Sequence, residues 1–223
     1  NRIVTLLYRG LVREVINRSF PRKRVRTETR MLPLTDRGYY EGDIIDPDIL
    51  ATSVDIARAG ILPSMVCFEA LSEILAPGTV RQDHILMNRT TNAADQVTGA
   101  ATHGRKIAGP VADRFVLFPD PMGATGGSLT EAISYYRDGL DGTPRHCFAL
   151  NLIVTPEFIR KLTTTFPDGV SVYAYRLDRG LSSDAALAAC PGELPDEECG
   201  LTETQYIVPG AGGMGEVMNN ALT

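Results

Sequence analysis

The sequence predicts an α/β protein built on an open, twisted and mainly parallel sheet flanked by helices. Between residues 52 and 175, short apolar runs alternate with segments of helical periodicity, as expected for parallel strands joined by helices. The chain has 223 residues, of which 43% are apolar and 22% charged, so it can bury a sizeable core. We therefore expect one domain over residues 1–223, with an N-terminal arm (1–50), a core (51–175) and a C-terminal region (176–223).

The N-terminal arm is basic, although the whole chain carries a net charge of −5. The positive side chains of residues 13–30 are Arg13, Arg18, Arg22, Lys23, Arg24, Arg26 and Arg30. We interpret this segment as a solvated face or a subunit contact, because no aromatic residues interleave with the charges of residues 22–30. The net charge of the whole chain gives no general reason for a nucleic-acid partner, and we expect none. Apolar runs are too short to cross a bilayer, so we expect no membrane partner either.

The core is expected to contain five strands and three helices. The strands are expected near residues 53–58, 84–88, 114–119, 146–154 and 170–175, and the helices near residues 62–75, 128–138 and 156–166. Residues 90–109 are rich in Ala, Thr and Gly, and they predict a flap or an extended hairpin. Residues 182–204 hold two prolines and an acidic cluster, and they predict an exposed excursion.

The most informative segment follows the strand expected at residues 114–119. A carboxylate, Asp120, comes directly after this strand, and a glycine-rich turn then leads into a helix. The N–H groups of such a turn converge on a phosphate, while Asp120 is placed to accept hydrogen bonds from sugar hydroxyls. We call this segment the phosphate loop; it comprises Asp120, Pro121, Met122, Gly123, Ala124, Thr125, Gly126, Gly127 and Ser128. The alternative is an ordinary strand-to-helix turn with Ser128 as the helix N-cap.

Two arginines follow other expected strands. Arg58 ends the first core strand and precedes Ala59 and Gly60, and Arg89 follows the second strand. The carboxyl ends of strands in an open α/β sheet form the usual ligand crevice, and arginine is a suitable donor for diphosphate groups. Taken alone, Arg58 is better explained as a surface residue at a strand end. Together with the phosphate loop, they predict a polyphosphorylated ligand at one edge of the sheet.

A glycine-rich segment near the C-terminus, from Gly210 to Gly215, satisfies the dinucleotide-binding pattern G-x-G-x-x-G. We reject that interpretation, because only eight residues follow Gly215 and neither a helix nor a second strand is expected there. A backbone wall that lies close against a flat ligand is the better interpretation.

The cysteines predict no zinc site, and we expect no metal ligands from the protein. Cys67, Cys147, Cys190 and Cys199 include no Cys-x-x-Cys pair, and the three histidines lie far from them in sequence. Cys67 lies in a predicted helix and Cys147 in a predicted strand, as expected for reduced core thiols of a cytoplasmic protein. Cys190 and Cys199 would pair only in an oxidising compartment.

At these motifs the chain resembles the uracil phosphoribosyltransferases, within the type I phosphoribosyltransferase fold. The phosphate loop is similar to that family's phosphoribosyl-diphosphate motif, in which proline replaces the second acidic residue of most relatives. Arg58-Ala59-Gly60 resembles the pyrophosphate loop, and Arg89 matches the arginine that opens the flap. Tyr206-Ile207-Val208-Pro209-Gly210 is similar to the family's hood, whose backbone reads the pyrimidine edge. We therefore call residues 176–223 the hood.

This resemblance, which covers roughly residues 50–223, implies that uracil and 5-phospho-α-D-ribose 1-diphosphate react to give UMP and diphosphate. It implies that Mg²⁺ is bound mainly through the diphosphate of the substrate, and that the enzyme serves pyrimidine salvage as a homodimer or a higher homo-oligomer. The resemblance assigns the 5′-phosphate to residues 125–128, the ribose hydroxyls to Asp120, and the departing diphosphate to Arg58 and Arg89. The base would contact Ile207, Gly212, Gly213 and Met214.

The hood departs from the family pattern in three places. The family usually has Gly-Asp-Ala where this chain has Gly212-Gly213-Met214, so a carboxylate is missing at Gly213. Glu216 stands where the family usually has aspartate, and its longer side chain can reach back toward the site. Residues 185–204 replace what is normally a very short link. Three alternatives therefore remain: a catalytically weak or regulatory nucleotide-binding homologue, an enzyme for another nucleobase, and a partner-binding protein that has kept only the fold.

Overall fold

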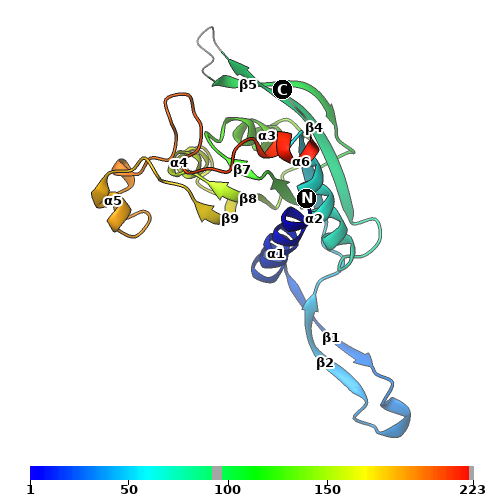
Figure 1. Ribbon diagram of the computed structural model, residues 1–223. Coiled ribbons are helices and arrows are strands. Elements are labelled where there is room, and N and C mark those ends of the chain that lie inside the picture. Colours follow the sequence, from blue (N-terminus) through cyan, green and yellow to red (C-terminus); the bar gives the residue numbers. More distant parts are fainter. Residues whose placement is uncertain (92–96, 221–223) are drawn as a thin grey trace.

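The computed structural model describes residues 1–91 and 97–220. In these ranges an open sheet with helices on both faces forms the body of the molecule, and a two-stranded arm extends away from it (Figure 1). The strands of the sheet are β3 (Ala51–Ala57), β4 (Val80–Thr91), β5 (Val97–Lys106), β6 (Phe115–Pro119), β7 (Met122–Gly123), β8 (His146–Val154) and β9 (Val170–Leu177). The longer helices are α1 (Arg2–Ser19), α2 (Ile61–Ser72), α3 (Gly127–Asp138) and α4 (Pro156–Thr165).

The sheet confirms the predicted fold class. Its strands lie in the order β5-β4-β3-β6-β8-β9, with β7 beside the far end of β8. The pairs β3–β4, β3–β6, β6–β8 and β8–β9 are parallel, and β4–β5 is antiparallel. Strands β6 and β8 are buried almost throughout, because helices cover both faces of the sheet. Because β3 and β6 are neighbours and run parallel, their carboxyl ends lie at the same edge of the sheet.

Alternating residues of these central strands contribute to two apolar layers. On one face, Leu117 and Leu150 pack with residues of α1 and α2. On the other face, Val116 and Phe118 pack with residues of α3 and α4. This alternation follows from the two-residue period of a strand, and it fixes which helices lie above and below the sheet.

Helix α1 belongs to the core, although the sequence analysis assigned no element to residues 1–50. Its buried residues recur at helical spacing and are Val4, Tyr8, Leu11, Val12, Val15 and Ile16. The Tyr8 hydroxyl donates a hydrogen bond to the Leu150 carbonyl of β8 at 3.2 Å. The part of residues 1–50 that extends from the body is therefore the hairpin of β1 (Arg22–Glu28) and β2 (Tyr39–Ile45).

The hairpin, which we call the β-arm, neutralises part of its own positive charge. Lys23 Nζ lies 3.0 Å from Asp46 Oδ1, and Arg24 Nη2 lies 3.7 Å from Glu41 Oε1 on the opposite strand. These pairs fit a solvated face better than a surface built to bind phosphates.

The expected flap is present as the antiparallel hairpin of β4 and β5, which is longer than predicted because β4 begins at Val80. Residues 92–96 of this flap lie outside the described ranges. The base of the hairpin is held by the buried Asp83, which accepts hydrogen bonds from Arg81 Nε at 3.1 Å and from the Tyr136 hydroxyl at 2.8 Å.

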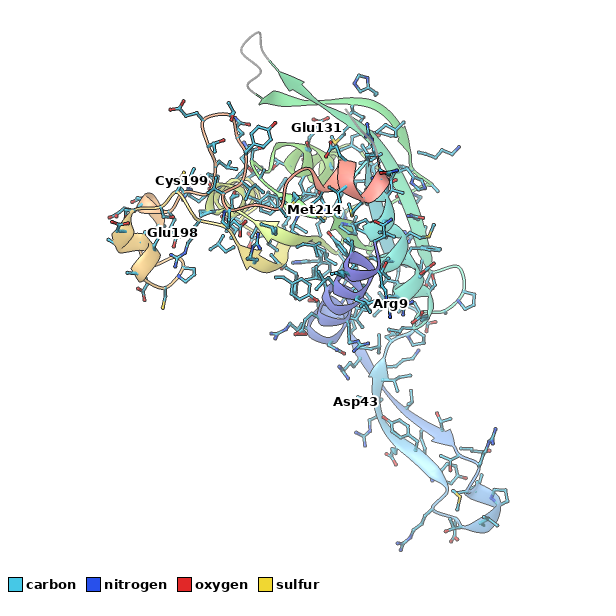
Figure 2. The ribbon with its side chains drawn as sticks, in the orientation of Figure 1. Arg9, Asp43, Glu131, Glu198, Cys199 and Met214 are labelled. Atoms are coloured by element: carbon cyan, nitrogen blue, oxygen red, sulfur yellow. The ribbon has the colours of Figure 1, made fainter. Side chains whose placement is uncertain are left out.

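The expected excursion at residues 182–204 contains the short helix α5 (Asp184–Ala188) and a 3₁₀ turn at Pro195–Glu197. Its two ends are joined by a largely buried ion pair between Arg179 Nη1 and Glu198 Oε1 at 2.9 Å, and Figure 2 shows where Glu198 lies. Arg160 of α4 also donates a hydrogen bond to the Pro195 carbonyl at 2.8 Å. The excursion is therefore exposed but not detached.

Candidate active site

The phosphate loop leaves the sheet at the end of β6 and runs into α3. The Asp120 N–H donates a hydrogen bond to the Leu150 carbonyl at 3.0 Å, and Asn151 Nδ2 donates to the Asp120 carbonyl at 2.6 Å. The Asp120 carboxylate accepts a hydrogen bond from the Met122 N–H at 3.3 Å. Burial, with a further contribution from the charge of Asp120, raises the pKa of the Tyr8 hydroxyl well above its ordinary value. The carboxylate therefore lies just after β6, close enough to Tyr8 of α1 for its charge to act on that hydroxyl.

The turn into α3 depends on Gly126, the N-cap residue of the helix, which has a φ of +78°. That backbone conformation favours glycine, and a Cβ at this position would lie 3.0 Å from Leu162 Cδ1. The alternative with Ser128 as the N-cap is wrong, because the helix already begins at Gly127. The N–H groups of the first helical turn have no carbonyl partner in their own helix, so this start of α3 suits an anion.

The loop from Arg58 to Gly60 lies against the end of β6, where the phosphate loop begins. A Cβ on Gly60 would lie 2.7 Å from Ile56 N and 3.2 Å from the Pro119 carbonyl oxygen, so glycine permits this close approach. The peptide bond between Ala57 and Arg58 is cis, and the Arg58 side chain is exposed. The structure thus brings Arg58 and Asp120 to the same edge of the sheet, although they are far apart in sequence.

Arg89 lies on β4, where its backbone pairs with Ala100 of β5. The parallel pairing of β3 with β4 ends at Ala57 and Leu86, so Arg89 comes three residues beyond that end. Its backbone therefore stands at the expected edge of the sheet, whereas its side chain lies outside what the structure describes.

The hood is fixed to β9 by a buried carboxylate. Asp178 accepts a hydrogen bond from the Gly210 N–H at 2.8 Å, and Arg176 donates one to the Gly210 carbonyl at 3.0 Å. Arg176 and Asp178 are themselves joined at 2.6 Å, and this hydrogen bond raises the pKa of the arginine. The hood backbone therefore enters its glycine-rich turn from a fixed position.

The residues expected to contact the base lie on both sides of that turn. Ile207 forms an antiparallel bridge with Leu201, and Gly212 has a φ of +71° with open space around it. Gly213 precedes the short helix α6 (Met214–Asn219), which the sequence analysis wrongly excluded. Figure 2 shows Met214 at the start of this helix, and Ile207 and Met214 both pack against the apolar core.

Helix α6 brings the hood to the Arg58 loop. A Cβ on Gly215 would lie 3.4 Å from Ala59 Cβ, and Asn219 Nδ2 lies 3.4 Å from the Arg58 carbonyl oxygen. The Glu216 carboxylate folds back onto Gly213 and occupies the space that a Cβ there would need. The structure therefore brings the hood, the Arg58 loop and the phosphate loop together at one edge.

Three residues near the phosphate loop were not predicted from the sequence. Asn151 and Thr155 are fully buried on β8 and at the N-cap of α4, and Phe158 packs on the loop from the first turn of α4. Among the described residues, Asn151 Oδ1 is buried with no hydrogen-bond partner. A polar residue inside the apolar run 146–154, followed by a Thr-Pro-Glu helix start, is the pattern that could have indicated this region.

Metal ligands of protein origin do not cluster in residues 1–91 and 97–220, where no group of three or more His, Cys, Asp or Glu side chains is arranged to hold an ion. In the same ranges, no helix is long and apolar enough to span a membrane.

Comparison with known proteins gives the family. Residues 2–197 match the family described as Uracil phosphoribosyltransferase. The chain belongs to this family. A uracil phosphoribosyltransferase of Dictyoglomus turgidum is 30% identical over 202 residues, which cover 90% of this chain and 77% of the relative. One of Kineococcus radiotolerans is 31% identical over 165 residues, which cover 73% of this chain and 63% of the relative.

Other comparisons concern coverage and fold. A uracil phosphoribosyltransferase of Wolinella succinogenes is 33% identical over 111 residues, so the chain spans only 42% of that relative's length. The structure of the AQ2163 protein from Aquifex aeolicus is similar, with a TM-score of 0.69 and 18% identity, over 100% of this chain and 86% of that chain. This similarity concerns the fold. The family match ends at residue 197, before the hood residues 207–214.

Proposed function

We propose that this chain transfers the phosphoribosyl group of 5-phospho-α-D-ribose 1-diphosphate to uracil, giving UMP and diphosphate in cytoplasmic pyrimidine salvage. The observation that carries the proposal is the packing of the Arg58–Gly60 loop against the end of β6, from which the phosphate loop begins. A phosphate site and a diphosphate-binding arginine at one edge of the sheet match the two ends of the donor. Family membership supports the same reaction.

The two ends of the donor would be bound by different chemical groups. Backbone N–H groups of residues 125–128 at the start of α3 bind the 5′-phosphate, and the Asp120 carboxylate accepts hydrogen bonds from the ribose hydroxyls. Arg58, with Arg89 from the flap, donates to the diphosphate. Magnesium is part of the substrate in this proposal, because the diphosphate supplies the oxygen ligands that this ion prefers.

In the reaction, the bond between C1 of the ribose and the diphosphate oxygen breaks, and a bond between C1 and N1 of the base forms. The N1 proton of the base is released, and diphosphate leaves with the electron pair. Positive charge develops on the sugar and negative charge on the leaving group, so the protein accelerates the reaction by positioning and by charge stabilisation. Arg58 supplies the second effect on the leaving diphosphate.

The base would lie against the hood turn, between Ile207 and the backbone of residues 212–214. Uracil presents alternating carbonyl acceptors and N–H donors, which backbone groups can pair with. The Glu216 carboxylate folded onto Gly213 favours a second candidate, in which the altered hood accepts a different nucleobase or turns over slowly.

A direct assay tests this proposal. Purified protein is incubated with the phosphoribosyl donor, Mg²⁺ and one of uracil, cytosine, orotate or hypoxanthine, and nucleotide and diphosphate are measured. We expect UMP from uracil. Product from another base alone would contradict the uracil assignment, and tight donor binding without product would support the weak or regulatory homologue. Absence of both donor binding and product would overturn the proposal and leave a partner-binding protein.

We also propose that copies of the chain associate through the outer side of α2 and through the β-arm. The outer side of helix α2 is apolar at its start, where Ile61 and Met65 are 44% and 45% exposed, and becomes polar at Glu69. Exposed apolar side chains of this kind are typical of a helix that is covered by a partner. The β-arm has few contacts with the body and carries the exposed Met31 and Leu34 near its end. A two-stranded hairpin has little stability by itself, so contact with a second copy would stabilise both surfaces.

A further inference from the structure

The first turn of α4 contacts the phosphate loop through a buried hydroxyl. Thr155 is fully buried, and its Oγ1 donates a hydrogen bond to the Ala124 carbonyl at 2.6 Å. The same oxygen accepts a hydrogen bond from the Phe158 N–H at 3.0 Å, which makes Thr155 the N-cap of α4. The Thr155 N–H also donates to the Gly123 carbonyl at 3.0 Å. One residue therefore fixes two consecutive carbonyls of the phosphate loop.

Phe158 adds a packing contact to the same segment. It is only 1% exposed, and its ring lies so close to Gly123 that a Cβ there would be 2.8 Å from Phe158 Cδ2. A real Cβ does not approach a ring carbon this closely, so the ring and the glycine fit only in their present positions. Phe158 thus limits the movement of the phosphate loop toward α4.

The same turn contacts the hood on its other side. The Glu157 carboxylate accepts hydrogen bonds from the Gly200 N–H at 3.0 Å and from the Leu201 N–H at 3.2 Å. Leu201 is the bridge partner of Ile207, which lies in the base-binding part of the hood. A Cβ on Gly200 would lie 3.2 Å from Thr155 Cβ, so the hood backbone at Gly200 also packs directly on the turn.

We propose that this turn, residues 155–158, is a joint that sets the distance and angle between the 5′-phosphate site and the base site. Thr155 and Phe158 position the phosphate loop, and Glu157 positions the hood at Gly200 and Leu201. None of the three needs to touch a substrate. Misplacement by about 1 Å is enough to slow a positioned reaction about 10²-fold, so rigid coupling of the two sites has a direct catalytic value. The inference rests on the proposed function.

The test separates the two halves of the joint with two probes, ribose 5-phosphate and UMP, whose binding is measured by calorimetry. Ribose 5-phosphate reports on the phosphate loop, and the ratio of the two affinities reports on the base site. We expect Thr155→Val to weaken both ligands about tenfold and to leave their ratio unchanged, because it removes the hydrogen bond to Ala124. We expect Glu157→Gln to weaken UMP about tenfold and ribose 5-phosphate less than twofold.

Two control variants distinguish positioning from general loss of stability. Thr155→Ser keeps the hydroxyl and is expected to restore the affinity for ribose 5-phosphate. Ser53→Ala removes another buried hydroxyl, which donates a hydrogen bond to the Ser64 carbonyl at 2.9 Å and has no bond to the phosphate loop. This variant is expected to leave both affinities unchanged. If Thr155→Val does not fold, Gly123→Ala replaces it, with the same expected pattern because its methyl group would displace the loop from Phe158.

The outcomes are distinguishable. Wild-type protein that binds neither probe would overturn the proposed function. If wild type binds both probes and Thr155→Val and Glu157→Gln bind them equally tightly, the proposed role of residues 155–158 would be overturned, whereas the proposed function would not. Parallel weakening of both probes in every variant, including Ser53→Ala, would show a merely structural role and would also overturn it.

Discussion

Arg58 stands at the end of β3, where its loop contacts both the end of β6 and helix α6. If it stabilises the leaving diphosphate, Arg58→Ala should lower turnover about 10²-fold, with a smaller effect on UMP binding. Steady-state kinetics and UMP titration measure the two effects. Arg13→Ala on the exposed side of α1 is the matched control and should keep wild-type rates. Near-normal turnover in Arg58→Ala would contradict the assignment.

Glu157 makes the joint sensitive to acid. Burial alone would raise its pKa, but hydrogen bonds from Cys199 and from the N–H groups of Gly200 and Leu201 outweigh burial and lower the pKa below its ordinary value of 4.5. A carboxyl whose pKa is lower in the folded state stabilises the fold above its unfolded pKa, and this stabilisation is lost as pH falls through the folded value. Glu157→Gln should therefore be less stable than wild type at pH 7, and the difference should shrink below pH 4.5.

Urea denaturation between pH 7 and pH 3 measures that difference. Glu203→Gln, an exposed glutamate in the same part of the hood, provides the control and should show no comparable change with pH. A constant stability difference between wild type and Glu157→Gln at all pH values would argue against an ionised Glu157 in the joint.

Single residues show where sequence reasoning succeeds and where it stops. The phosphate loop could be predicted because its glycines and Asp120 form a contiguous motif between a strand and a helix, and the structure has that strand and that helix. Thr155 could not, because its partner Ala124 is 31 positions away and the contact exists only after β7 and β8 have paired. The Glu216 carboxylate was expected to reach back, and its contact with Gly213 shows where it goes.

At the scale of elements, Asp83 links strand β4, helix α3 and the segment after β5. It is fully buried and accepts hydrogen bonds from Arg81, Tyr136 and the Ala108 N–H. Tyr136→Phe removes one donor from a buried carboxylate and should lower the free energy of unfolding by about 1–3 kcal/mol. Chemical denaturation measures this, with the half-buried Tyr135→Phe as a control expected to change it by under about 0.5 kcal/mol. Equal stability of the two variants would show that the hydroxyl is not needed.

The β-arm is the element whose role depends most on a second copy. Residues 24–43 can be replaced by Asn-Gly, because Lys23 and Ile44 face each other at the base of the hairpin and this dipeptide favours a tight turn. We expect the shortened protein to remain folded with an unchanged melting temperature. Light scattering should show a smaller assembly, with the mass of a monomer. Met65→Glu should act similarly on the α2 surface. An unchanged oligomer in both variants would contradict the proposed assembly.

Elements were predictable where their pattern is strong. The core strands and helices of residues 51–177 agree with the expected ones to within a few residues at most ends, because burial on both faces produces long apolar runs. Helix α1 was not expected, because arginines interrupt its apolar residues, although those that are buried recur at helical spacing. Helix α6 was excluded because few residues remain after Gly215, and six residues still suffice for a short helix that packs on the core.

For the whole molecule, three segments from different parts of the chain meet at one edge of a mainly parallel sheet. Two of them, the Arg58 loop and the phosphate loop, lie within the region that matches the uracil phosphoribosyltransferase family, and the third, the hood turn, lies beyond it. The family match therefore supports the sugar-phosphate half of the site more strongly than the base half. The excursion and the joint at residues 155–158 determine how this hood is placed.

The most direct test of the central claim is a crystal structure of the protein with UMP. The account predicts the 5′-phosphate at the N–H groups of residues 125–128, the ribose hydroxyls at Asp120, and the uracil ring against Ile207 and the hood turn. UMP bound elsewhere, or with its phosphate away from the start of α3, would contradict it.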